Sequence, residues 1–140
     1  MKIIPKIDKE TAWQEYHDHN PAEPRERFDL LWFKHPKSIR IIYGWLLAYQ
    51  DIFDYLIKNY FFDYQEDVYI YPAFTHNACT KDNKIFFNVQ RDFNRELDFG
   101  LIIHELVHVV DKMSEGATEQ ATIEIVKRIN GEFNLYINHG

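Results

Sequence analysis

Two histidines and a glutamate lie within five residues, in the sequence His104-Glu105-Leu106-Val107-His108. On a helix, side chains four residues apart project from the same face, so His104 and His108 can take adjacent positions on one tetrahedral zinc ion. Glu105 follows the first histidine and would reach a water molecule on that ion. Zinc lowers the pKa of its water toward about 7, so the carboxylate can accept the proton as the water attacks a carbonyl. The same group can then protonate the leaving amine.

The neighbouring residues favour a metal site over a solvated helix surface. Apolar residues surround the two histidines: Ile102, Ile103, Leu106, Val107, Val109 and Val110. The segment is therefore predicted to be a mostly buried helix. Unpaired polar groups on such a helix would be costly, and binding of a metal removes that cost.

A third ligand is expected downstream, in Ser114-Glu115-Gly116-Ala117-Thr118-Glu119. Together with the histidine pair, this segment resembles the gluzincin branch of the zincin metallopeptidases. Those proteins place a glutamate ligand on the next helix, often within Ser-Glu-Gly, and an acid four residues later hydrogen-bonds a zinc-bound histidine. The resemblance implies that Glu115 is the third ligand, that Glu119 contacts His104, and that Thr118 fills the small hydroxyl position before that acid.

The spacing departs from the large gluzincins, because Glu115 follows His108 by only seven residues. The first helix must therefore end soon after Asp111 and turn sharply. If two helices fold back at residue 112 or 113, the residue level with the histidines is nearer Glu119, which stays the alternative third ligand. Asp111 either orients a histidine or helps to end the helix.

Hydrophobic periodicity predicts helices and strands in the order helix, long helix, two strands, helix, helix. The helices are expected at 11–20, at 38–62 with Ser38 as N-cap, at 94–113, and at 115–129 before Asn130-Gly131; an apolar piece lies at 28–33, and strands at 68–71 and 84–90 form a hairpin or neighbouring strands. This order indicates one α+β domain. Helices and sheet occupy 1–93 and the metal-binding helix pair 94–140, a zincin-like arrangement.

The resemblance also implies how a substrate would bind. In zincin-like folds an exposed edge strand lies above the active-site helix and pairs with an extended peptide. The run 84–90, with Phe87 and Asn88, is the candidate edge strand, and an ordinary core strand is the alternative. Tyr71 and His76 are candidates to polarise the substrate carbonyl.

Composition limits the other partners. The net charge is -6 and no basic stripe is visible, which argues against nucleic acid. No apolar run approaches the length of a membrane span and no secretory signal is visible, so we expect a cytoplasmic protein without a membrane partner. The single cysteine, Cys79, excludes an intrachain disulfide.

The sequence therefore predicts a zinc metallopeptidase that binds one Zn²⁺ per chain and acts on a peptide or protein. A zincin-like domain that holds zinc for structure or regulation is the main alternative, and a metal-free interaction module is a third. Glu105 argues against a purely structural site, because such a site needs no base. Amide hydrolysis on a small molecule would use the same residues.

Overall fold

The computed structural model describes residues 1–90, 95–112 and 114–138. These residues form an α+β fold with a four-stranded sheet, so the expected fold class is confirmed. The elements are β1 (Ile3–Pro5), α1 (Lys9–His19), α2 (Arg25–Lys34), α3 (Pro36–Ala48), α4 (Gln50–Asn59), β2 (Val68–Ala73), β3 (Ala78–Lys81), β4 (Lys84–Asn88), α5 (Arg95–Asp111) and α6 (Glu115–Phe133).

The sheet has the strand order β1-β2-β4-β3. β1 pairs with β2 in parallel, with Ile3 opposite Val68, and β2 pairs with β4 in parallel. β3 runs antiparallel to β4 through a turn in which Asp82 has φ 55°. The two predicted strands are thus neighbours, whereas the hairpin joins β3 and β4.

The edge position suggested for the run 84–90 is wrong and the alternative, a core strand, is confirmed, because β4 lies inside the sheet between β2 and β3. The edge next to β4 is β3, whose residues are polar or small and lack the pattern of a strand. Edge strands are often short and polar, since this disfavours unwanted pairing. Phe87 is 1% exposed within the core, and Asn88 accepts a hydrogen bond from Gln90 N at 2.7 Å.

The single long helix predicted over 38–62 is divided into α3 and α4 at Tyr49. Helix α3 begins at Pro36, so Ser38 is not its N-cap. The apolar period continues through Tyr49, which hides the break in the sequence. The ring of Tyr49 packs against Phe99 of α5 at a centroid distance of 4.4 Å, so the division accompanies tertiary packing.

The last helix runs past the predicted end at Asn130-Gly131 and closes at Asn134, which has φ 53°. Asn130 lies inside the helix, and its side chain holds the segment that follows the helix. Its Nδ2 donates to Ile137 O and its Oδ1 accepts from Ile137 N, both at 2.8 Å.

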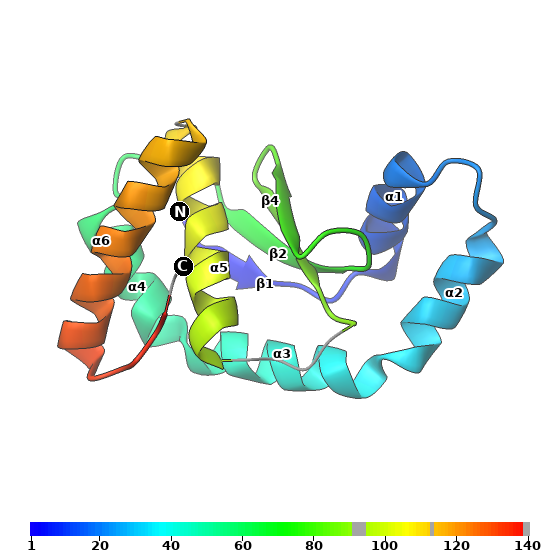
Figure 1. Ribbon diagram of the computed structural model, residues 1–140, viewed down its shortest axis with the longest axis horizontal. Coiled ribbons are helices and arrows are strands. Elements are labelled where there is room, and N and C mark those ends of the chain that lie inside the picture. Colours follow the sequence, from blue (N-terminus) through cyan, green and yellow to red (C-terminus); the bar gives the residue numbers. More distant parts are fainter. Residues whose placement is uncertain (91–94, 113, 139–140) are drawn as a thin grey trace.

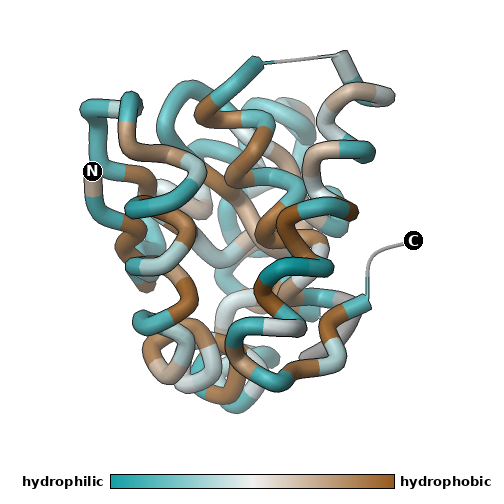
Figure 2. The backbone as a smooth tube through the Cα atoms, turned by 90° about the vertical axis from the view of Figure 1, so that its left-hand side faces the viewer, coloured by the Kyte–Doolittle hydropathy of each residue, from teal (hydrophilic) through white to brown (hydrophobic). Residues whose placement is uncertain are grey.

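The sheet stands between α5 on one side and α1 on the other (Figure 1). Ile70 and Ile85 belong to the main core, while Tyr71 and Phe86 form a smaller apolar cluster. Successive residues of a strand face opposite sides, which accounts for this division. In Figure 2 the helical turns alternate between apolar and hydrophilic segments, as expected of helices that cover a core on one side.

Within the described ranges, no helix has the length and apolar character needed to cross a membrane.

Phe99 ties α5 to the α3–α4 junction, and its removal should destabilise the fold. It is fully buried and stacks on Phe53 at 5.6 Å. We expect Phe99→Ala to lower the free energy of unfolding by about 3–5 kcal/mol in urea titrations, because it leaves a cavity. Phe62, which is 66% exposed, is the matched control, and Phe62→Ala should stay within about 0.5 kcal/mol of wild type. Equal losses in the two variants would contradict this account of the core.

Candidate metal centre

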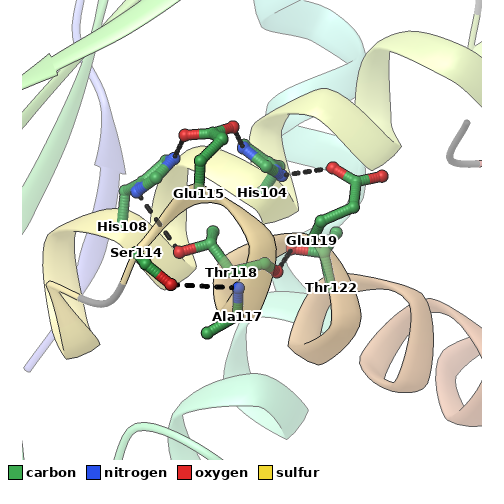
Figure 3. Close-up of polar contacts among 8 residues, drawn as sticks. All are labelled: His104, His108, Ser114, Glu115, Ala117, Thr118, Glu119 and Thr122. Carbon is green, nitrogen blue, oxygen red and sulfur yellow. Dashed lines mark hydrogen bonds and ion pairs between the residues drawn. The ribbon is translucent and has the colours of Figure 1, made fainter.

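A short connection turns α6 back against α5. Lys112 adopts φ 50°, and Ser114 caps α6 by accepting a hydrogen bond from Ala117 N at 3.3 Å. The N-cap directs the first turn of α6, and with it Glu115, toward the end of α5 (Figure 3). The sharp turn expected from the seven-residue spacing is present.

The two histidines lie on one face of α5. His104 is 5% exposed, whereas His108 is half-buried, and their rings are 4.7 Å apart between centroids. Ile103 and Val107 beside them are fully buried, so the backbone of this turn is fixed in the core. The histidines therefore have little freedom to move apart.

The Glu115 carboxylate lies between the two rings (Figure 3). One oxygen accepts from His104 Nε2 and the other from His108 Nε2, each at 2.9 Å. One donor atom from each of the three residues lies within 4.8 Å of the others. The hydrogen bond from His104, with the adjacent His108, holds the pKa of Glu115 below its usual value.

Two imidazoles and one carboxylate form a donor set that zinc accepts, with a fourth position left for water. Around a tetrahedral ion with bonds of about 2.0–2.1 Å, neighbouring donor atoms are ~3.3 Å apart. The observed distances of 2.9 Å are slightly shorter. The three donor atoms are within 4.8 Å of one another, so the side chains must rotate to close on one ion, and Glu115, which is 75% exposed, has room to do so.

Helix α6 also contacts the other nitrogen of each ring. His104 Nδ1 is 3.5 Å from Glu119 Oε2, and His108 Nδ1 is 3.4 Å from Thr118 Oγ1. Thr118 is fully buried, and its carbonyl accepts from Thr122 Oγ1 at 2.7 Å. An oxygen beside Nδ1 favours the ring orientation in which Nε2 faces the centre.

Glu119 lies beside His104, the histidine that the resemblance implied it contacts. It lies on the Nδ1 side of His104, away from the pair of Nε2 atoms (Figure 3). An ideal helical hairpin would bring it level with the histidines, but α6 is inclined to α5 in Figure 1. The contact from Thr118 to His108 was not predicted, since the sequence indicated only a small hydroxyl residue there.

Glu105 is 8% exposed, on the same turn of α5 as His104. Burial raises the pKa of its carboxyl group, His108 and His104 oppose the rise, and Glu115 adds to it. A carboxylate of raised pKa is a stronger base than an exposed one, and its acid form is more readily available.

Three other predicted residues are not brought to the histidines. Tyr71 lies on the sheet face nearer α1, where its ring stacks on Phe86 at 5.7 Å. His76 lines a cavity of about 380 Å³ between α1 and the β3–β4 hairpin, with its ring 4.8 Å from that of His19. Strand alternation and the loop before β3 direct both side chains away from α5.

Asp111, the third of these, faces the end of α4. It lines two small cavities together with Tyr60 and Phe61, and burial raises its pKa. Among the described residues it has no hydrogen bond or ion pair with either histidine. Its position at the last residue of α5 fits the alternative role of ending the helix.

Sequence reasoning missed a buried polar cluster around Glu15 of α1, which is 6% exposed. Its Oε1 accepts from Thr75 Oγ1 and lies 3.7 Å from Cys79 Sγ and 3.3 Å from His19 Nδ1. Burial raises the pKa of the Cys79 thiol to about 12, and the nearby carboxylates of Glu15 and Glu105 add to the rise. These residues are far apart in the sequence and carry no joint pattern.

Comparison of the chain with protein-family models, with curated proteins and with solved structures found no match.

The high pKa of Cys79 predicts an unreactive thiol. Only the thiolate reacts with iodoacetamide, and the folded protein should hold little of it at pH 8. We expect alkylation of the folded protein to be about 10²-fold slower than in urea, because the higher nucleophilicity of a weaker acid offsets part of the lost thiolate. Mass spectrometry over time gives both rates. Similar rates in the folded and unfolded protein would contradict the buried contact with Glu15.

Proposed function

We propose that this protein is a zinc-dependent metallopeptidase. The observation that supports the proposal best is the Glu115 carboxylate, whose two oxygens reach Nε2 of His104 and of His108. This brings three zinc-type donors together, and the buried Glu105 lies on the same helix as the two histidines. Such a combination suits hydrolysis better than a structural site, which normally has four protein ligands and no base.

His104, His108 and Glu115 would hold the ion. A bound zinc ion supplies a Lewis acid, which polarises a carbonyl and lowers the pKa of water. Thr118 and Glu119 place oxygens beside the two Nδ1 atoms, where the ring proton would stay once each Nε2 gives up its contact with Glu115 and binds the ion. The ring orientation needed for binding is therefore built in by α6.

Glu105 would move the proton. Its carboxylate accepts a proton from the attacking water and then delivers it to the nitrogen of the leaving amine. The raised pKa favours the first step, because the group binds the proton more firmly than an exposed glutamate does, and the leaving amine nitrogen is more basic still and takes the proton in the second step. The balance is one water consumed, one C–N bond broken, and one carboxyl and one amino group formed.

The edge strand β3 favours an extended peptide as substrate. It pairs with β4 on one side only and packs against α5. Its other side offers backbone N–H and C=O groups, to which an extended chain can add as a further strand. This role falls to Ala78–Lys81 in place of the run 84–90.

The alternative is a zinc-binding domain of the same fold that cleaves nothing. It would need the three ligands and the contacts from α6, but not Glu105. A test that separates metal binding from hydrolysis therefore distinguishes the two functions.

We expect Glu105→Gln to retain one zinc per chain and to lower hydrolysis about 10²–10⁴-fold, because glutamine cannot accept the proton. Elemental analysis gives the metal content, and mass spectrometry of a peptide library gives the cleavage rate. Cleavage by wild type and by Glu105→Gln at equal rates would rule out the proposed mechanism. Bound zinc with no cleavage by wild type would favour the non-hydrolytic alternative.

The two glutamates should differ in their effect on zinc affinity. Glu119→Ala should weaken binding about 10–100-fold, the usual effect of removing a partner of a metal-bound histidine. Glu115→Ala and His108→Ala each remove a ligand and should weaken it more. Competition with a zinc-binding dye measures all four proteins. A greater loss from Glu119→Ala than from Glu115→Ala would assign the third ligand to Glu119.

A further inference from the structure

An apolar groove lies between α2 and α3, away from the metal centre. It encloses about 590 Å³, and its lining includes Ile7, Trp32, Phe33, Ile39, Gly44 and Leu47. In Figure 1, α2 lies at the far end of the molecule from α5 and α6. The residues proposed to bind zinc take no part in the groove.

The groove continues into exposed apolar surface. Phe33 is 73% exposed, Leu47 61% and Ile7 52%, and Leu30 on α2 is 62% exposed. Single exposed apolar residues are common, whereas several large ones beside one groove indicate a surface that another molecule covers.

Gly44 keeps part of this groove open. It lies in the interior of α3, where glycine disfavours the helix relative to alanine. A Cβ added at Gly44 would meet no atom within 4 Å. No neighbour within the described chain therefore requires the missing side chain, and the space at Gly44 is available to an occupant from outside.

The charge beside the groove is opposite to that of the whole chain. Lys34, Lys37 and Arg40 are all exposed, and no Asp or Glu occurs between Asp29 and Asp51. The chain as a whole carries a net charge of -6. Arg40 lines the groove, and Lys34 and Lys37 follow the lining residues Phe33 and Pro36 in the sequence. Positive charge on the helices that form an apolar groove is complementary to a partner that is apolar on one side and acidic on the other.

The shape and the charge together select the kind of partner. A second copy presenting the same groove would place like charges together, as a two-fold interface requires. A bilayer covers projecting surfaces, whereas a concave groove accepts inserted side chains. Apolar side chains spaced three and four residues apart on a helix fit such a groove. We propose that the α2–α3 groove binds an acidic amphipathic helix of another protein.

The test uses a synthetic helical peptide of about 18 residues, with leucine at three- and four-residue spacing and glutamate on its other side. Fluorescence anisotropy with the full-length protein should show binding that added salt weakens. The same peptide with lysine for glutamate should bind at least ~10-fold more weakly. Equal binding of the two peptides would overturn the charge assignment.

Gly44→Leu should fill the groove and weaken binding of the acidic peptide at least ~10-fold, since it occupies the space that an inserted side chain needs. Gly131→Leu is the matched control, because Gly131 is also inside a helix with no atom within 4 Å of an added Cβ. It should leave binding unchanged. Thermal melting of both variants verifies folding, and binding retained by a folded Gly44→Leu would overturn the proposal.

Two further measurements address the other occupants. Binding to phosphatidylserine vesicles that Gly44→Leu abolishes, without binding of the acidic peptide, would assign the groove to an anionic membrane and overturn the proposal. A dimer in sedimentation that Gly44→Leu dissociates would assign the groove to a second copy and would also overturn the proposal.

Lys37→Glu with Arg40→Glu should reverse the preference between the two peptides.

Discussion

The packing of α6 against α5 is the constraint on which the metal centre depends, because it brings residues of one helix to the two histidines of the other. His104 is buried, and a buried imidazole without a partner is costly. Glu115 meets this need for both histidines at once, but only if α6 begins directly after the turn. Lys112 in the left-handed region and Ser114 as N-cap make that start possible. The positions of Thr118 and Glu119, one turn further on, then follow from the helical repeat.

How far the sequence predicts the structure depends on how many residues separate the interacting residues along the chain. The face shared by His104 and His108 follows from a four-residue step and was predictable. The first turn of α6 was also close to its predicted place. Strands β1 and β3 were missed because they are short and are defined by their partners, and the division at Tyr49 coincides with packing on Phe99, fifty residues away. The Glu15 cluster has the same non-local origin.

The two proposed sites differ in the forces they use. The metal centre depends on a few donor atoms at fixed distances, held by a buried helix. The α2–α3 groove depends on apolar area and on charges that act through solvent. Salt within the physiological range should therefore weaken partner binding at the groove far more than metal binding by the three-residue donor set. The sheet and the α3–α4 junction separate them, so each site can change in sequence with little steric demand on the other.

The pairing of β1 with β2 has a consequence for the order of folding. Ile3 lies opposite Val68, and Lys2 N donates to Asp67 Oδ1 at 2.8 Å, so the first strand needs residues that are made much later. During synthesis, helices α1 to α4 emerge before β1 has a neighbour to bind. Closing so long a loop reduces chain entropy before any strand contact compensates for it. Local helical contacts should therefore form first, and registration of the sheet should be the slow step.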